Sequence, residues 1–230
     1  RLAVLPLALG LVAADAPQMD PMNPTCPAAP NWSDKKRMEI TPVVINDTKV
    51  LLAEGVVDSG LPERMKTALD AHPDALEIWF RSPGGNARAG NEAGRVIRQS
   101  KRFIISRIPN GWACFSACNF VFMGAPARIV EPGGNFMVHM FTVTGQRDAI
   151  EMTLEEGTDS AIALIGDIEQ ESALLATEDN DFLIRMGVSR ELLTDVMYRQ
   201  KAVAGGGEDR SPRRCLTPEE ALKYNVANAE

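Results

Sequence analysis

The stretch LEIWFRSPGGNARAGNEAGRVIRQSKRFIISRI, residues 76–108, contains one complete strand–helix–strand unit. Leu76–Phe80 has the apolar and aromatic composition of a strand and stops at the turn Ser82-Pro-Gly-Gly85. Ala87–Ser100 carries apolar residues at helical spacing, and Phe103–Ile108 again has the composition of a strand. Two strands joined by a crossover helix run parallel in one sheet. The stretch therefore predicts an α/β fold with a parallel sheet.

The flanking sequence extends this pattern in both directions. Before the unit, Met38–Ile45 and Lys49–Val57 are predicted strands, and a helix begins near Ser59. After it, the predicted elements are a helix from about Ser116, strands at Ala127–Val130 and Phe136–His139, helix-forming residues over 147–203 broken near Gly187, and a short helix at Pro218–Tyr224. We therefore expect one α/β domain over residues 38–230 with a helix-rich insertion at about 141–203.

Three segments that follow predicted strands carry residues suited to acyl transfer. Ser116 stands at a predicted helix start, where the helix dipole favours an alkoxide, and His139 follows 23 residues later. Gly84 and Gly85 allow backbone amides to approach a carbonyl oxygen. Alone, the serine is an ordinary N-cap, the histidine a core residue and the glycines a turn. Their occurrence together, at the carboxyl ends of parallel strands, predicts a nucleophile, a base and an oxyanion site.

Four segments, in order, resemble landmarks of the proteolytic subunit of Clp protease (ClpP), in the ClpP/crotonase superfamily. They are Ser82–Gly85, Gly111–Ala125 around Ser116, Asn135–His139 and Leu216–Val226. The resemblance covers roughly residues 48–140 and 213–228. It implies a ClpP/crotonase-like β-α-β superhelical core and a homo-oligomer. It also implies that Ser116 is the nucleophile, His139 the general base, and Gly84 or Gly85 with the amide of Ala117 the oxyanion donors.

The chain departs from the family pattern at the third catalytic residue. The resemblance places an aspartate where this sequence has Arg213, and an arginine cannot accept the N–H of a neutral imidazole. Other acids remain open as substitutes, and so does a Ser–His dyad with a backbone carbonyl behind the histidine. The acids are Glu208 and Asp209 upstream of Arg213, and Asp148 and Glu151 downstream of His139.

Charge and composition exclude some classes of partner. The 230 residues carry a net charge of −7, and the few basic clusters are short, so we expect no nucleic-acid binding. Cys114 and Cys118 are spaced Cys-x₃-Cys with no nearby histidine, which does not indicate a zinc site. No cofactor and no metal are expected.

The N-terminal segment predicts export. Leu2–Ala14 is apolar and ends in small residues, as a secretory signal peptide does. Residues 15–37 form a proline-rich leader that we expect to be extended and poorly packed, with Cys26 as a candidate tie to the domain. A periplasmic or secreted location follows. The alternative is an uncleaved anchor that holds the protein on the extracytoplasmic side of a membrane.

The cysteines fit an oxidising compartment. Cys26, Cys114, Cys118 and Cys215 predict two disulfides with three possible connectivities, among which the sequence does not choose. Cys114 and Cys118 flank Ser116, so at least one bridge is expected to brace the nucleophile turn.

The predicted function is that of an exported ClpP-like serine hydrolase, a peptidase that cleaves peptides or unfolded chains without ATP. The compartment lacks ATP, which argues against an ATP-driven unfoldase partner. The main alternative is a catalytically inactive ClpP fold used as a binding or assembly module. A crotonase-type acyl-CoA enzyme is the third hypothesis; it would use the oxyanion amides without needing Ser116 and His139.

Overall fold

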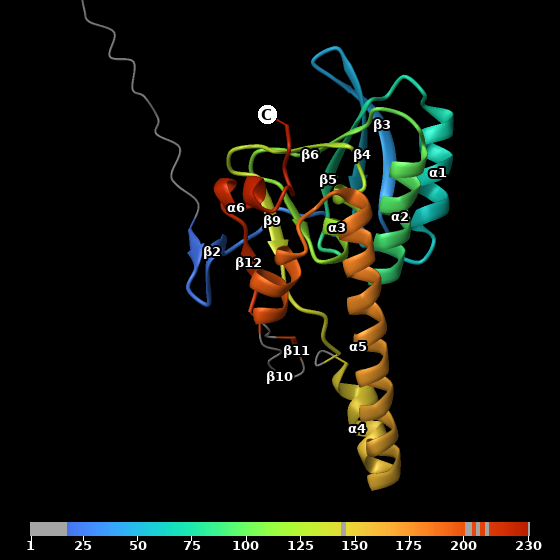
Figure 1. Ribbon diagram of the computed structural model, residues 1–230, viewed down its shortest axis with the longest axis vertical. Helices are drawn as coiled ribbons and strands as arrows, with labels where there is room; N and C mark the ends of the chain where they lie inside the picture. Colours follow the sequence, from blue (N-terminus) through green and yellow to red (C-terminus); the bar gives the residue numbers. More distant parts are fainter. Residues whose placement is uncertain (1–17, 144–145, 201–203, 206–207, 210–211, 230) are drawn as a thin grey trace, which may run out of the picture.

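The computed structural model describes residues 18–143, 146–200, 204–205, 208–209 and 212–229. The predicted signal segment, residues 1–14, lies outside the described residues. The chain forms a main sheet, a smaller second sheet, helices packed on the main sheet and a long helical hairpin that projects from the body (Figure 1). Ser116 and His139 lie where the second sheet meets these helices.

The main sheet is built around the predicted strand–helix–strand unit. In spatial order its strands are β3 (Glu39–Ile45), β4 (Thr48–Glu54), β5 (Glu77–Arg81), β6 (Ile105–Ile108) and β8 (Ala127–Val130). β3 and β4 are antiparallel, and β4, β5, β6 and β8 run parallel. Asn46 and Asp47 join the hairpin with φ values of 48° and 62°, as a tight two-residue turn requires. The predicted α/β class is confirmed.

Three helices pack in contact along this sheet. α1 (Leu61–Ala71) and α2 (Ala87–Gln99) lie side by side on one face (Figure 1), and α3 (Ala117–Met123) packs against α2. A Cβ on Gly90 of α2 would lie 2.5 Å from the carbonyl oxygen of Ala117, so the glycine lets the two helices touch through their backbones. This contact fixes the start of α3, where Ser116 stands.

The second sheet positions the two residues of greatest interest. It has the order β12 (Arg214–Cys215), β9 (Asn135–Val138) and β7 (Ala113–Phe115). β7 and β9 are adjacent and parallel. Ser116 comes directly after β7 and His139 directly after β9, so the two residues lie at the carboxyl ends of neighbouring parallel strands. The sequence pattern did not predict β7, because three residues are too few to show a period.

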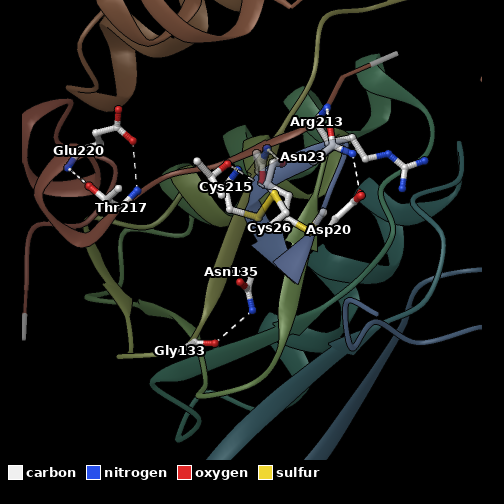
Figure 2. Close-up of a disulfide and its surroundings, with 12 residues drawn as sticks. Asp20, Asn23, Cys26, Gly133, Asn135, Arg213, Cys215, Thr217 and Glu220 are labelled. Carbon is white, nitrogen blue, oxygen red and sulfur yellow. Dashed lines mark hydrogen bonds between the residues drawn. A yellow bond between two sulfur atoms is a disulfide. The ribbon is translucent and has the colours of Figure 1, made fainter. Parts of the chain in front are cut away.

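The leader packs on this second sheet. β1 (Met19–Asp20) and β2 (Asn23–Pro27) form a hairpin, and Cys26 is buried and bonded to Cys215 of β12 (Figure 2). The ring of Trp32 stacks on Phe115 with centroids 5.8 Å apart. Most of residues 18–37 are exposed or half-buried, and the disulfide of Cys26 and the ring of Trp32 hold this segment against the second sheet.

The helix-rich segment follows β9. It contains α4 (Arg147–Glu155), α5 (Thr158–Met186), the π-helical η1 (Leu192–Val196), the 3₁₀-helical η2 (Met197–Arg199), and a hairpin of β10 (Ala204–Gly205) with β11 (Glu208–Asp209). α5 ends at Gly187, which has φ +70°, the left-handed conformation of a helix C-cap. α4 and the first half of α5 project from the body (Figure 1).

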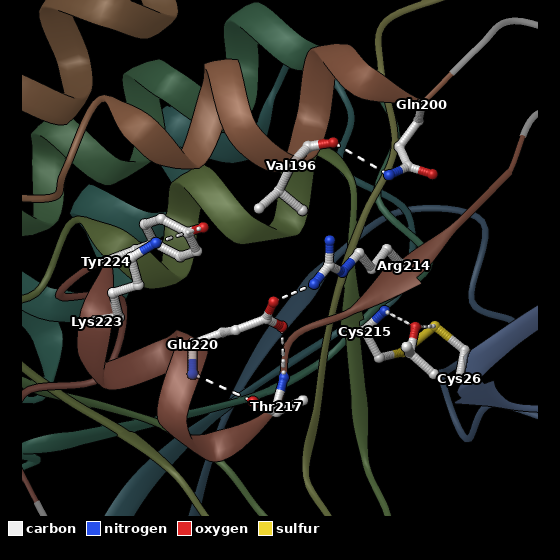
Figure 3. Close-up of polar contacts among 10 residues, drawn as sticks. Cys26, Val196, Gln200, Arg214, Cys215, Thr217, Glu220, Lys223 and Tyr224 are labelled. Atoms are coloured by element: carbon white, nitrogen blue, oxygen red, sulfur yellow. Dashed lines mark hydrogen bonds and ion pairs between the residues drawn. A yellow bond between two sulfur atoms is a disulfide. The ribbon is translucent and has the colours of Figure 1, made fainter.

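The C-terminal segment is tied to the body by a capped helix and a buried arginine. Thr217 and Glu220 form a capping box at the start of α6 (Pro218–Lys223), and Arg214 pairs with Glu220 (Figure 3). Arg128 of β8 is 1% exposed and donates to the carbonyl oxygens of Val226 at 2.9 Å and Asn225 at 2.8 Å. These bonds anchor the chain after α6 to the main sheet.

Candidate active site

Ser116 occupies a strained turn between β7 and α3. Its backbone has φ 55° and ψ −122°, a sparsely populated conformation that costs on the order of 1–3 kcal/mol for a residue with a side chain. The Ser116 amide donates to the carbonyl oxygen of Met137 at 3.2 Å, and Asn119 Nδ2 donates to the same oxygen at 2.6 Å. These bonds to β9 hold a sharp strand-to-helix turn of the kind that presents a nucleophilic serine.

A disulfide closes over this turn. Of the three connectivities left open by the sequence, the structure has Cys114–Cys118 and Cys26–Cys215. Cys114 and Cys118 lie on either side of Ser116, and both are fully buried. The short covalent loop therefore restricts the same backbone that carries the strain.

His139 lies in direct hydrogen-bond contact with the serine. His139 Nε2 is 2.7 Å from Ser116 Oγ. At this distance an unprotonated Nε2 accepts the hydroxyl hydrogen bond and can remove the proton as the oxygen attacks. The imidazole also packs on Phe115, with ring centroids 4.6 Å apart. Two parallel neighbouring strands thus bring together residues that are 23 positions apart in the chain.

The glycine turn after β5 approaches the serine closely. Gly84 and Gly85 have φ values of +87° and +144°, which favour glycine. A Cβ on Gly84 would lie 2.7 Å from Ser116 Cβ, and a Cβ on Gly85 would lie 2.2 Å from the carbonyl oxygen of Val57. Both positions therefore require glycine for space as well as for conformation.

The two glycine amides have different partners. The Gly84 amide donates to Ser82 Oγ at 3.1 Å, and that hydroxyl donates to the carbonyl oxygen of Gly55 at 2.6 Å. Within the described segments, neither the Gly85 amide nor the amide of Ala117, the first residue of α3, has a protein acceptor. Gly85 rather than Gly84 therefore has an available donor. Two free amides beside the serine can hold a negatively charged oxygen.

Ser116 and His139 line a cavity of about 350 Å³. Its other walls come from α3, α5 and η2, and include Phe120, Leu175, Asp179 and Met197. A smaller cavity of about 200 Å³ shares Leu175 and continues along α5. A larger cavity, about 480 Å³, lies elsewhere, between α6 and the β8–β9 turn, and contains none of the predicted site residues. The cavity at the serine is the one in which the chemistry described above can occur.

The candidate acids fall in two places. Asp148 is exposed in the first turn of α4, and Glu151 pairs with Arg147 at 2.5 Å on the same exposed helix. Glu208 and Asp209 form β11, and their side chains lie outside the described residues. The structure therefore leaves the third member of the site as a prediction.

Arg213 stands next to the site without entering it. Its amide donates to Asn23 Oδ1 at 2.6 Å (Figure 2), and its guanidinium carbon lies 5.1 Å from the centroid of the Phe115 ring. Phe115 in turn contacts His139. The arginine thus makes a cation–π contact with the ring that supports the histidine, and it supplies no acceptor.

No protein-family model matches this chain, and a search of curated proteins finds no match. Solved structures do match. ClpP1 from Listeria monocytogenes has a TM-score of 0.51 at 17% identity, over 77% of this chain and 87% of that one. A 1510-N membrane-bound stomatin-specific protease, as a serine-to-alanine mutant, has a TM-score of 0.50 at 17% identity, over 77% and 75%. The chain has a ClpP-like fold.

The cavity is also lined by one acidic residue that sequence reasoning missed. Asp179, on α5, is 5% exposed and lines the cavity with Ser116. Asn91 Nδ2 of α2 donates to Asp179 Oδ1 at 2.7 Å, and burial raises the pKa of Asp179 to about 6. The available signal was its position: it follows Leu175 by four residues and precedes Phe182 by three, on the apolar face of a helix.

Two further findings concern metals and membranes. Across the described part of the chain, no group of three histidine, cysteine or acidic side chains is placed to hold a metal ion. None of the described helices is both long and apolar enough to cross a bilayer.

Proposed function

We propose that this protein is a ClpP-like serine hydrolase that cleaves peptide bonds in peptides or unfolded chains through an acyl-enzyme, without ATP. The observation that supports this most directly is the 2.7 Å contact between His139 Nε2 and Ser116 Oγ. The free amides of Gly85 and Ala117 and the cavity beside them support it further. The ClpP-like fold is in agreement but does not carry the proposal.

The reaction follows from these positions. Ser116 Oγ forms a bond to the carbonyl carbon of the peptide while its proton passes to His139 Nε2. The carbonyl oxygen takes the displaced electron pair and accepts hydrogen bonds from the amides of Gly85 and Ala117. The carbon–nitrogen bond then breaks, and His139 returns the proton to the leaving amine. Water, deprotonated by the same histidine, releases the acyl group and restores the serine.

Labelling with a fluorophosphonate probe tests the proposal. The wild-type protein should form one covalent adduct, located at Ser116 by mass spectrometry, and Ser116→Ala should form none. Ser82→Ala is the matched control, because that buried hydroxyl bonds backbone groups and should not be the labelled residue. Absence of an adduct on the folded wild type would contradict the serine-hydrolase function.

The identity of the orienting acid is a separate proposal. Asp209 or Glu208 is favoured because both Asp148 and Glu151 lie on the exposed face of α4. Asp209→Asn, Glu208→Gln and Asp148→Asn should be compared by kcat. Loss of the orienting acid lowers kcat by roughly 10⁴-fold in serine proteases, so one variant should stand far below the others. Three variants with wild-type rates would favour a Ser–His dyad.

The inactive binding module remains the second candidate. Arg213, which packs on Phe115 in place of an expected acid, is the observation that favours it. The labelling experiment separates the two candidates: a folded protein with an unreactive Ser116 would act by binding.

Export is proposed from the apolar N-terminal segment and the two disulfides. The mature protein should begin at or near Asp15, and thiol counting under denaturing conditions should find no reactive thiol. Intact mass measurement that retains Leu2–Ala14 would favour the anchored form. Four reactive thiols would contradict both the bridges and the oxidising compartment.

A homo-oligomer is also proposed. The projecting hairpin of α4 and α5 exposes large apolar side chains, among them Met152, Leu154, Ile162 and Ile165. Exposed apolar surface of this kind marks association sites. Light scattering should give a mass of several chains for the wild type and a lower mass for Ile162→Glu combined with Ile165→Glu. A monomeric wild type would contradict it.

A further inference from the structure

Asp179 holds an unusual place in the cavity of Ser116. Most of the surrounding wall is apolar or uncharged, and apart from His139 it is the one titratable side chain among the described lining residues. Asp179 lies on the buried face of α5, and only 5% of its surface is exposed. A carboxyl group in such a position meets whatever enters the cavity.

The protein itself gives this carboxyl group little compensation. Asn91 Nδ2, which is buried on α2, donates to Asp179 Oδ1, and no described cation lies within ion-pair distance of the carboxylate. The other charged or titratable groups that act on it are Arg95 on α2, Glu178 on α5 and Tyr198 on η2. A buried carboxylate without a cation is destabilising, and a bound cation would relieve this.

The ionised form is present at neutral pH. The pKa of Asp179 is raised to about 6, mainly by burial and to a lesser degree by Glu178, against the opposing effects of Asn91 and Arg95. Above pH 7 most molecules therefore carry a negative charge at this point of the wall. The neighbouring walls are apolar side chains of Phe120, Leu175 and Met197.

We infer that Asp179 is a specificity residue that binds a cationic amine or guanidinium group of the substrate while the adjacent carbonyl is attacked by Ser116. The inference rests on the proposed function. A carboxylate beside the apolar side chains of Phe120 and Leu175 suits a lysine or arginine side chain, whose aliphatic stem would pack on them while its charged end pairs with the acid. The amino terminus of a short peptide offers the same charge without the stem.

Three fluorogenic peptides distinguish these sources of charge. The first is N-acylated with lysine at the residue that supplies the scissile carbonyl, the second has norleucine there, and the third has norleucine and a free amino terminus. Wild type should cleave the lysine peptide at least about tenfold faster, by kcat/KM, than the acylated norleucine peptide. Preference for the third peptide alone would assign the cation to the amino terminus, and equal rates on all three would overturn the inference.

Asp179→Asn tests the residue while keeping its shape and its bond to Asn91. It should lose the preference for the cationic peptide, by roughly tenfold or more, and cleave the neutral peptide within about threefold of the wild-type rate. Asp179→Glu keeps the charge and should keep part of the preference. Asp181→Asn, an exposed neighbour on the same helix, is the control and should behave as wild type. A variant that loses both activities equally would show a structural role and overturn the inference.

A binding measurement separates this inference from the proposed function. n-Butylguanidine should raise the Tm of the wild type and of Ser116→Ala, but not that of Asp179→Asn. Stabilisation of a protein that neither labels nor cleaves would leave the cation site intact and remove the hydrolase function. Labelling at Ser116 without any response to the guanidine or to charged peptides would support the hydrolase function and overturn the cation site.

Discussion

The two sides of the cavity differ in how the fold holds them. One side, the body wall, consists of Gly85, Ser116, Ala117 and His139, fixed by the β7–β9 ladder, the glycine turn and the Cys114–Cys118 disulfide. The other, the α5 wall, consists of Leu175 and Asp179 on a 29-residue helix whose first half projects from the body (Figure 1). The body wall is held by strand pairing and a covalent bridge, whereas the α5 wall is held by the packing of the second half of the helix on α2. Under the proposed function, the body wall carries out the chemistry and the α5 wall selects the substrate.

The largest effect is expected at the base. His139→Gln should lower kcat by roughly 10⁶-fold because the Ser116 hydroxyl loses the group that takes its proton. Steady-state kinetics with circular dichroism as a folding control would measure this. Combining it with Ser116→Ala should cost little more than either change alone, because the two residues act as a unit. Additive losses would break the assignment of chemistry to the body wall.

Gly85→Ala should come next. The new Cβ would meet the carbonyl oxygen of Val57 at 2.2 Å, and the backbone φ of +144° is unfavourable for alanine, so the amide must move. Loss of one oxyanion donor lowers kcat by about 10²–10³-fold. KM should change much less, because the donor acts mainly on the transition state. A wild-type kcat would remove Gly85 from the oxyanion site.

Asp179→Asn should change stability on the α5 wall. The pKa of Asp179 is about 6 in the folded protein and 3.8 without burial. Between about pH 4 and pH 6 the unfolded chain therefore loses this proton while the folded protein keeps it, so the stability of the wild type decreases as the pH rises. At pH values above 6 this pKa shift lowers the free energy of unfolding of the wild type by about 3 kcal/mol. Denaturant unfolding should show Asp179→Asn gaining up to about this amount at pH 8, about half of it at pH 5 and almost none at pH 3. If the stability of the two proteins depended on pH in the same way, Asp179 would not be a buried carboxylate without a cation.

The smallest effect is expected at Gly166. It lies in the projecting half of α5 with open space where a Cβ would be, in contrast to Gly85. Gly166→Ala should therefore stabilise the helix by about 0.5–1 kcal/mol and leave the peptidase rate unchanged. Thermal unfolding measures the first and kinetics the second. A large loss of rate would mean that the projecting half of α5 takes part in the chemistry.

The elements of the body wall could be predicted because they depend on local patterns. The strand–helix–strand unit at residues 76–108 shows its periods directly, and the structure has β5, α2 and β6 there. Ser116 at the start of a helix and His139 at the end of a strand were predicted too, although their catalytic roles remain predictions. β7 was missed, and the partner of Cys26 was left open, because a three-residue strand and a disulfide to a distant residue leave no periodic signal.

The α5 wall could not be predicted to the same depth. The helix itself was expected, and so was its break near Gly187, where the backbone turns left-handed. No local sequence pattern predicts that α5 packs against α2. This packing buries Asp179 beside Asn91 and places Asp179 in the wall of the cavity. In the sequence the residue is one acid among many in an acidic helix.

The sequence by itself determined the α/β class, the glycine turn and the two residues suited to act as nucleophile and base, because each depends on neighbours within a few positions. The tertiary structure decided the rest: the 2.7 Å approach of His139 to Ser116, the choice of Gly85 over Gly84, the pairing of Cys26 with Cys215 across 189 residues, and the burial of Asp179. The physical reason is that hydrogen-bond partners, loop closure and desolvation depend on contacts between segments far apart in the chain.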